Sequence, residues 1–504
     1  MQKRTIRAIC AIIALLMLVP MMFACNNSGG TETSGGPGVT TPGNGEEEEK
    51  LVLPEDHTYD GETFTILTAG NVAYNDFNFT EEEESVLGQA QYKRVQVIRQ
   101  ENDVIIELIT DENKSSFGAG PGFKRISDAV IADDITYHLG IIGGYDVAKL
   151  AEGNYLYDLN SLNWVETGKS WWDQNANDDL TINGMLFFTN GSLTAAYSQS
   201  TYTIYLNKAL AEEAIPDVDI YQLVKDMKWT IDKLGEFSKT VSEDLGGNGQ
   251  MDPSDRYGLY VWDDSILGMM GAAGTKSATV GADGKIELTL YNDNTINMFN
   301  KFTEIAYNKE YALTYQRYNS SQLNGGVVVG FQENRALLWA TSNTNTKLIR
   351  DMEASFGIVP YPMLTEDQGR YYSTIAPYNS QFICVPLIKD PEVADMVGVI
   401  AESLAYYGKN ITWPACYEQT LKGAFARDDG TMDMLDIIYG SYVYDIGYYY
   451  QIGGYGSAMM KLLRAYSNTF NSMYETSRES AQNQLDTINA NYAVVYEEWK
   501  ALQG

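Results

Sequence analysis

An α/β fold with a mostly parallel sheet is predicted by strand-like and helix-like segments that alternate early in the chain. Thr63–Thr68 (TFTILT) and Val104–Thr110 (VIIELIT) read as strands, and Tyr137–Asp146 (YHLGIIGGYD) reads as a third strand whose end is rich in glycine. Between the first two strands, one helical stripe about 100° wide carries the apolar side chains Leu87, Ala90, Val97 and Ile98. This order of elements predicts ligand-binding loops at the carboxyl edge of the sheet.

Near the C-terminus, a second helical pattern predicts an amphipathic helix that packs on the core. Its apolar residues recur at helical spacing and are Met459, Leu462, Leu463, Tyr466 and Phe470. Polar residues separate them, so this helix is not expected to span a membrane.

The N-terminus is a basic segment followed by an apolar one that ends near a cysteine. The basic residues are Lys3, Arg4 and Arg7. Ala8–Val19 has about the length of a signal-peptide core and is shorter than the ~20 residues of a spanning helix. Ala24 then precedes Cys25, an order that resembles a bacterial lipoprotein signal, although Met22 and Phe23 depart from it. We therefore expect residues 1–24 to be removed and Cys25 to carry lipid; an ordinary secretory signal with an incidental cysteine is the alternative.

A polar stretch follows the cysteine and is expected to act as a tether. Asn26–Lys50 has Val39 as its only aliphatic residue and contains the acidic run Glu46–Glu49, so it cannot bury enough apolar surface to fold. A flexible chain of this length reaches roughly 25–30 Å. Residues 25–57 are therefore assigned to the lipidated cysteine and its tether, which would hold a globular body at the outer face of the cytoplasmic membrane.

The composition limits what this body can bind. The formal net charge is −32 at pH 7, and the acidic residues are spread along the chain, so the phosphate backbone of a nucleic acid would be repelled. The chain also contains 36 Tyr and 8 Trp. Exposed Tyr and Trp offer flat apolar faces with a polar edge, which suit sugar rings and peptide-like ligands.

Histidine and cysteine are too rare to support several kinds of catalytic site. His57 and His138 are the only histidines, so a zinc site or a Ser-His-Asp triad has almost no imidazole to use. Neither a phosphate-binding P-loop nor a glycine-rich dinucleotide motif occurs. Beyond the signal and Cys25, only Cys384 and Cys416 remain, and the sequence leaves open whether they pair.

The order of several motifs along the body resembles the extracellular solute-binding proteins of ABC transporters, family 1 type. The matching segments are Tyr145–Leu162, Ile182–Gly191, Thr201–Glu213, Met227–Val241, Phe331–Thr344, Phe356–Pro362 and Pro391–Leu404. They lie in the order of that family and extend over roughly residues 60 to 495.

This resemblance implies a type II periplasmic-binding-protein-like fold, with two α/β lobes, a hinge and a ligand cleft between the lobes. The N-lobe would be residues 58–200 plus 338–405, and the C-lobe residues 201–337 plus 406–504. The resemblance further implies a monomer without catalytic activity that captures a small solute, which we expect to be a carbohydrate, and delivers it to a membrane permease. Such closure of two lobes around a ligand is a hinge transition.

Residues at the ends of the strands are the candidates for contact with the solute. From the first lobe and the hinge they are Gly70, Asn71, Tyr145, Asp146, Tyr197 and Ser198. From the second lobe and the second crossing they are Trp262, Asp263, Ser342, Asn343 and Tyr455. We expect Trp262 and Tyr145 to stack on ring faces, while Asp and Asn side chains bond hydroxyl groups.

Two other functional classes remain open from the sequence. A surface glycoside hydrolase could use the same aromatic and acidic residues, although no spacing singles out a carboxylate pair. A ligand sensor that signals to a membrane partner is the second alternative, and no residue distinguishes it from a transport protein.

The segment Asp244–Asp255 (DLGGNGQMDPSD) resembles a calcium-binding loop of the EF-hand type. Its predicted ligands are Asp244, Asn248, Gln250 through its backbone carbonyl, Asp252 and Asp255, with Gly249 at the required sharp turn. Gly246 removes one side-chain ligand, and Asp255 is shorter than the usual glutamate. A glycine-rich and acidic turn without metal is the alternative; a bound calcium ion would have a structural role.

Overall fold

A computed structural model describes residues 49–70, 76–111, 118–194, 200–319, 321–323, 325–417 and 430–503. All of them belong to one compact unit, Gly36–Gly504. Cys25, most of the tether, Asn71, Tyr197 and Ser198 lie outside the described residues. Within the described residues, no helix is both long and apolar enough to cross a membrane.

The first lobe is built on a five-stranded sheet of order β2-β1-β3-β13-β4. Its strands are β1 (Glu62–Ala69), β2 (Val104–Asp111), β3 (Leu139–Gly143), β4 (Phe188–Thr189) and β13 (Gln381–Cys384). Strands β1, β2 and β3 are parallel, and β13 runs antiparallel to β3 and β4. The three strands predicted from the sequence are confirmed. Strand β13 comes from a distant segment and places Cys384 in the middle of the core.

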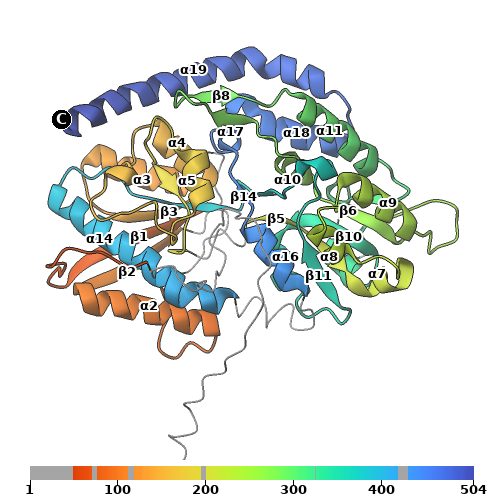
Figure 1. Ribbon diagram of the computed structural model, residues 1–504, viewed down its shortest axis with the longest axis horizontal. Helices are drawn as coiled ribbons and strands as arrows, with labels where there is room; N and C mark the ends of the chain where they lie inside the picture. The colour runs from red at the N-terminus through yellow and green to blue at the C-terminus, as the bar shows by residue number, and fades with distance from the viewer. Residues whose placement is uncertain are drawn as a thin grey trace, which may run out of the picture. The chain divides into compact units, whose positions relative to one another are not determined.

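Helices cover this first sheet. They are α2 (Val86–Asn102), α3 (Pro121–Ala132), α4 (Gly144–Glu152), α5 (Gln174–Leu180) and α14 (Pro391–Tyr407), with a π-helical turn at Gly408–Thr412. The predicted helix α2 begins at Ser85, whose hydroxyl accepts the backbone N–H of Gly88 at 3.0 Å. Helix α2 packs beside α14, so two segments 300 residues apart in the sequence form one layer (Figure 1).

The second lobe has a five-stranded sheet of order β11-β5-β10-β6-β9. Its strands are β5 (Tyr202–Asn207), β6 (Tyr257–Val261), β9 (Ala312–Thr314), β10 (Ala336–Ser342) and β11 (Phe356–Val359). Strand β10 is parallel to β6, which is parallel to β9, whereas β5 runs antiparallel to both β10 and β11. A short hairpin, β7 (Ala278–Val280) and β8 (Ile286–Leu288), stands apart from this sheet.

The helices of the second lobe surround its sheet (Figure 1). They are α7 (Lys208–Ala214), α8 (Ile220–Lys225), α9 (Ile231–Val241), α10 (Ser265–Ala272), α11 (Asp293–Ala306), α12 (Val327–Gln332), α13 (Thr346–Ile349), α16 (Gly430–Tyr439) and α18 (Tyr455–Ala465). Helix α9 packs against β6, and α10 against α11 and α18.

Three segments that run between the two lobes lie at their junction in the described part of the chain. The first crossing joins β4 to β5, and the second joins β12 (Ser373–Thr374) to β13. The third follows β14 (Tyr442–Val443), which pairs with β12, and leads to α17 (Ile446–Tyr449). The bridge between Thr201 and Ile375 holds the first two crossings side by side.

These crossings move the lobe boundaries expected from the sequence. We expected residues 338–405 in the first lobe, but β10 and β11 belong to the second sheet, and the chain returns only after Ile375. Likewise, the π-helical turn Gly408–Thr412 packs on α2 of the first lobe, although residues 406–504 were expected in the second. Alternation of strands and helices does not reveal which of two sheets a given strand joins.

The C-terminal helix α19 (Phe470–Gln503) contacts both lobes. Phe470 packs on Phe299 of α11, with ring centroids 5.2 Å apart, and Tyr492 packs on Phe187 of the first lobe at 5.5 Å. Figure 1 shows α19 running across the top of both lobes. The single helix predicted through Phe470 is instead two helices, because Tyr466 adopts a left-handed conformation (φ 55°) that ends α18.

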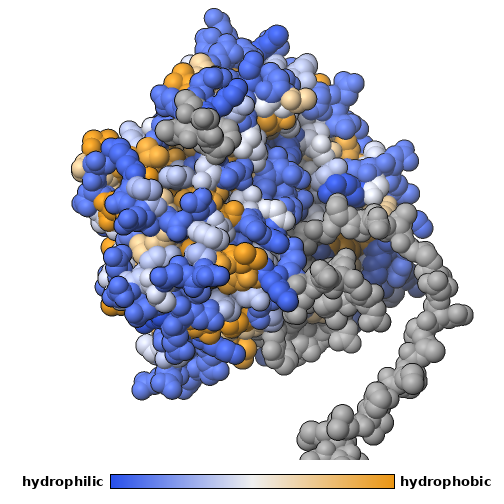
Figure 2. Space-filling model, turned by 60° about the vertical axis from the view of Figure 1, so that its left-hand side comes forward, coloured by the Kyte–Doolittle hydropathy of each residue, from blue (hydrophilic) through white to orange (hydrophobic). Residues whose placement is uncertain are grey.

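The surface view in Figure 2 shows a face on which hydrophilic residues predominate and hydrophobic residues lie in small separate groups. This distribution is ordinary for a surface in contact with water.

Candidate functional site

The carboxyl ends of β1 and β3 meet the start of β13 at one edge of the first sheet. A Cβ atom added to Gly70 would lie 3.2 Å from Nε2 of Gln381 and 3.4 Å from Cα of Gly143. The side-chain amide of Gln381 donates hydrogen bonds to the carbonyl oxygen of Ile141 (3.1 Å) and the hydroxyl of Thr68 (3.3 Å). This edge is therefore tightly closed, and glycine is required where the strand ends approach one another.

The matching edge of the second sheet carries an acidic pair. Strand β6 is followed directly by Trp262, Asp263 and Asp264. Asp263 is fully buried and forms an ion pair with Arg464 of α18. Asp264 is 8% exposed. Burial is the main cause that raises the pKa of Asp264 well above its usual range, and the neighbouring carboxyl of Asp263 raises it further.

Five tyrosines surround Asp264, and we call them the tyrosine cluster. They are Tyr145, Tyr202, Tyr315, Tyr361 and Tyr448. Burial is the main cause that raises the pKa of each one, and the charge of Asp264 adds to it. The ring of Tyr202 lies 6.3 Å from that of Tyr361 and 6.1 Å from that of Trp262.

The tyrosine cluster joins the two lobes. Tyr145 is the second residue of α4 in the first lobe, whereas Tyr202 begins β5 and Asp264 follows β6 in the second. Since the charge of Asp264 raises the pKa of Tyr145, these two side chains from different lobes lie near each other. Aromatic rings and carboxyls from both lobes thus meet where the resemblance predicts the ligand cleft, and we call this place the interlobe cleft.

Several solved structures share this arrangement of two sheets. UgpB from Mycobacterium tuberculosis, in complex with glycerophosphocholine, has a TM-score of 0.52 and 14% identity, and the match covers 79% of this chain and 95% of that one. The ABC substrate-binding protein Lmo0181 from Listeria monocytogenes, in complex with cycloalternan, has a TM-score of 0.51 and 15% identity, and the match covers 86% of this chain and 100% of that one. The maltose/maltodextrin-binding domain MalE from Bdellovibrio bacteriovorus, bound to maltotriose, has a TM-score of 0.50 and 12% identity, and the match covers 84% of this chain and 100% of that one.

The chain has the two-lobe fold of ABC solute-binding proteins. Neither a protein-family model nor a curated protein matches the sequence. The fold was expected from the motifs, which lie in the segments that build the two sheets and their crossings.

Six residues predicted from the sequence lie at the two facing edges of this solute-binding fold. They are Gly70, Tyr145, Trp262, Asp263, Ser342 and Asn343. The last two lie beside the hinge, where the backbone N–H of Asn343 donates to the carbonyl oxygen of Thr201 at 2.8 Å. Contact of these residues with a solute stays a prediction.

Two other predicted residues have structural roles instead. The carboxyl of Asp146 accepts the backbone N–H groups of Gly120 (3.0 Å) and Phe123 (3.3 Å), so it caps the start of α3. Tyr455 is 1% exposed, and its ring stacks on Tyr474 of α19 with centroids 5.4 Å apart. Its hydroxyl donates to the carbonyl oxygen of Tyr474 at 2.9 Å, which places Tyr455 in the packing between α18 and α19.

Four residues of the cleft were not predicted from the sequence. They are Asp264, Tyr202, Tyr361 and Tyr448. Asp264 directly follows the predicted Asp263, so its position after the same strand could have predicted it. The tyrosines come from three distant segments that converge only in the folded chain.

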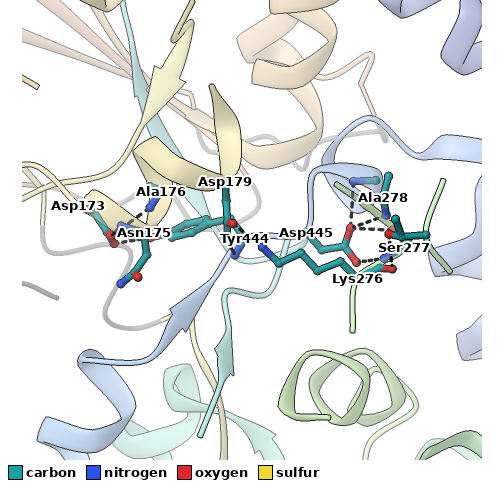
Figure 3. Close-up of polar contacts among 11 residues, drawn as sticks. Asp173, Asn175, Ala176, Asp179, Lys276, Ser277, Ala278, Tyr444 and Asp445 are labelled. Carbon is teal, nitrogen blue, oxygen red and sulfur yellow. Dashed lines mark hydrogen bonds and ion pairs between the residues drawn. The ribbon is translucent and has the colours of Figure 1, made fainter. Parts of the chain in front are cut away.

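A buried polar network holds the third crossing between the lobes (Figure 3). Tyr444 donates its hydroxyl hydrogen to Asp173, which caps α5, at 2.7 Å, and its backbone N–H to Asp179 at 2.9 Å. Asp179 also forms an ion pair with Lys276, which precedes the β7–β8 hairpin. The network therefore links the first lobe, the crossing and the hairpin.

The next residue of this crossing, Asp445, extends the network toward the hairpin. Its carboxyl accepts the backbone N–H of Ser277 at 2.6 Å and the hydroxyl of Ser277 at 2.7 Å (Figure 3). Burial raises the pKa of Asp173 and of Asp445 to about 6, although their hydrogen bonds oppose that shift.

In the predicted calcium loop, hydrogen bonds already use most of the acidic oxygens. Asp244 Oδ2 accepts the backbone N–H of Gly249 at 2.6 Å, and Asp255 accepts those of Leu245 (2.9 Å) and Asp252 (2.7 Å). Asp252 and Asn248 close tight turns in the same way, by accepting the N–H groups of Ser254 and Gln250. In the described part of the chain, no three acidic, histidine or cysteine side chains are grouped as a metal site requires.

The two cysteines left open by the sequence are both free and buried. Cys384 lies within β13, and Cys416 follows the π-helical turn.

Proposed function

We propose that the protein captures a small carbohydrate in the interlobe cleft and delivers it to an ABC importer. The observation that carries this proposal is the meeting of Tyr145 from the first lobe with Asp264 and Tyr202 from the second. A solute held by both edges would stabilise the closed arrangement, because each lobe alone offers only half of the contacts.

The chemistry of the cleft suits a sugar. Trp262 keeps part of its surface accessible beside the buried ring of Tyr202, so the indole offers a flat apolar face to a pyranose ring. Carboxyl and amide groups at the same strand ends can accept and donate hydrogen bonds to hydroxyl groups. Two of the structural neighbours contain bound saccharides, cycloalternan and maltotriose, and a third contains glycerophosphocholine.

We propose a binding protein and not a hydrolase. Asp263 and Asp264 are consecutive residues whose carboxyls interact directly. A glycosidase needs two carboxyls about 5–9.5 Å apart, on either side of the scissile bond. Asp263 is also held in an ion pair with Arg464, so it is not free to act as the second catalytic carboxylate. A sensor that reports to a signalling partner remains the alternative for the step after capture.

A ligand screen tests this proposal. Thermal unfolding is measured with a panel of neutral and charged mono- and oligosaccharides, and each solution is analysed afterwards for hydrolysis products. We expect at least one sugar to raise the melting temperature without being consumed, since a ligand that binds only the folded state stabilises it by mass action. Formation of product would favour the hydrolase, and no response to any sugar would contradict capture of a carbohydrate.

The site of action proposed from the sequence is the outer face of the cytoplasmic membrane, where Cys25 carries lipid and the protein meets its permease as a monomer. Cys25→Ser is expected to release the protein into the medium, because the tether would then have no anchor. Cys10→Ser, which changes the other cysteine of the signal region, is the matched control and should leave the protein on the membrane. Membrane retention of the Cys25→Ser protein would contradict the anchor.

A further inference from the structure

The charge at the second-lobe edge of the cleft is not balanced. Arg464 forms an ion pair with Asp263, whereas Asp264 forms none with a described residue. The charge of Arg464 and a hydrogen bond with Tyr202 favour the ionised form of Asp264, but burial and the carboxyl of Asp263 outweigh them. Asp264 is also 8% exposed, so water screens its carboxyl poorly. A buried carboxyl without a cation is costly when it is ionised, and it favours either a proton or a positively charged partner.

The groups packed around Asp264 add no further positive charge. The described charged and titratable groups that interact with Asp264 are Asp263, the five members of the tyrosine cluster, and Arg464, which forms its ion pair with Asp263. Among these groups, Oδ1 of Asp263 is buried and has no hydrogen bond from a described residue other than an interaction with the carboxyl of Asp264. This acceptor, the electron-rich rings and a second carboxyl without an ion pair of its own make this end of the cleft attractive to a cation.

We propose that the solute carries a protonated amine or another cationic nitrogen, as an amino sugar does, and that this group binds between Asp264 and the tyrosine cluster. This inference rests on the proposed capture of a carbohydrate and narrows the class of the solute. The hydroxyl-bearing part of the solute would lie toward Trp262, and the nitrogen toward Asp264. A neutral sugar in the same position would leave the carboxyl without a charged partner.

Proton release distinguishes this binding mode from capture of a neutral sugar. Without ligand, the carboxyl of Asp264 holds a proton near neutral pH, because burial and Asp263 raise its pKa. A protonated amine favours the ionised carboxylate, so the proton leaves to the buffer when the amine binds. A neutral sugar gives no reason for that proton to leave.

The experiment uses matched pairs of sugars that differ by one amine: glucose and glucosamine, galactose and galactosamine, mannose and mannosamine. Calorimetric titrations of the intact protein at pH 6.5, in phosphate and in Tris, measure affinity and proton exchange together. For at least one pair we expect the amino sugar to bind about 10-fold more tightly than its neutral partner, with release of about one proton. N-acetylglucosamine has the same nitrogen without the charge and should behave like glucose.

A variant identifies the carboxyl. Asp264→Asn keeps the shape of the side chain and removes its charge, so the preference for the amine should fall to within about twofold and proton release should disappear. Asp351→Asn is the control, since the Asp351 side chain is 87% exposed and lies on the turn after α13. If Asp264→Asn does not fold, proton release by the unmodified protein still decides the question.

The outcomes separate the two proposals. If each neutral sugar binds at least as tightly as its amino sugar, and the binding enthalpy is the same in both buffers, the proposal of a cationic nitrogen is wrong. The proposed capture of a carbohydrate would then still hold. Failure of every sugar of both kinds to bind would contradict both proposals.

Discussion

The core of the first lobe and the edge of the second each bury a carboxyl, and the two carboxyls have different partners. Glu402 of α14 is 1% exposed, and its two oxygens accept the indole N–H groups of Trp171 at 2.8 Å and Trp172 at 2.9 Å. Asp264 is 8% exposed and instead faces a second carboxyl and the tyrosine cluster. Burial is the main cause of the raised pKa in both cases.

This difference separates a structural carboxyl from one that belongs to a binding site. The donors of Glu402 come from within the protein, so part of the cost of burying that group is offset as soon as the lobe folds. At Asp264, the hydrogen bond with Tyr202 and the charge of Arg464 do not outweigh burial and the neighbouring Asp263, so this carboxyl favours a proton or a bound partner. Changes at Glu402 should therefore alter stability, and changes at the cleft should alter binding.

Replacement of Glu402 is expected to give the largest effect. Glu402→Leu removes the acceptors that the described residues provide for two buried indole N–H groups, so the free energy of unfolding should fall by about 2–4 kcal/mol. Urea denaturation followed by tryptophan fluorescence measures the loss. Glu479→Leu, an exposed position on α19, is the control and should change stability by less than about 0.5 kcal/mol. A similar small change in Glu402→Leu would show that the two indoles find other acceptors.

The pH dependence of stability tests the state of Glu402. Its pKa is raised to about 7 in the folded protein, chiefly by burial, against 4.5 for an ordinary glutamate. Between these two values the folded state holds a proton that the unfolded state has released. Stability should therefore be greatest at the acidic end of this window and fall by up to about 3 kcal/mol as the pH rises to 7.

A neutral variant isolates this contribution. Glu402→Gln cannot ionise, so denaturation curves between pH 5 and 7 should be flatter than those of the unmodified protein. Some slope of the same sign should remain, because the pKa values of Asp173 and Asp445 are also raised by burial, to about 6. Identical slopes in the two proteins would contradict an ionisation of Glu402 in this range.

These contrasts also show how far the sequence could be interpreted. The parallel strands of the first lobe follow from local alternation, and Trp262 and Asp263 were placed at the cleft because they end a predicted strand. The partnership of Glu402 with Trp171 joins residues 231 positions apart, and no local pattern reveals it. For the same reason, Asp146 was taken as a ligand contact, although it caps a helix that begins 25 residues earlier.

Trp262→Ala should weaken binding more than it weakens the fold. We expect a loss of about 1–3 kcal/mol in binding free energy for any sugar that raises the melting temperature, because a large aromatic contact is removed. Trp262 lies at the edge of the core and keeps part of its surface accessible, so the unfolding free energy should change less than in Glu402→Leu. Calorimetry and urea denaturation of the same variant provide both values. Unchanged affinity would place Trp262 outside the binding site.

The smallest effect is expected in the loop Asp244–Asp255, where the calcium site stays a prediction. Its turns are already closed by hydrogen bonds from backbone N–H groups to Asp244, Asp252 and Asp255. One buried oxygen, Asp244 Oδ1, has no hydrogen-bond partner, and it lies 3.5 Å from the position that a Cβ of Gly246 would occupy. A calcium ion would find this oxygen unused, but it would have to compete for the others.

Millimolar calcium should therefore raise the melting temperature by no more than about 2–4 °C, the shift that 1 kcal/mol produces in a domain of about 150–250 residues. The measurement compares calcium, magnesium and chelator on the unmodified protein, on Asp244→Asn and on the exposed control Asp351→Asn. Asp244→Asn should lose the response to calcium, whereas the control should keep it, because only Asp244 offers the unused oxygen. If the unmodified protein does not respond to calcium, hydrogen bonds alone hold the loop. Asp255→Ala would then still lower stability in chelator, since its carboxyl binds the N–H groups of Leu245 and Asp252 without any metal.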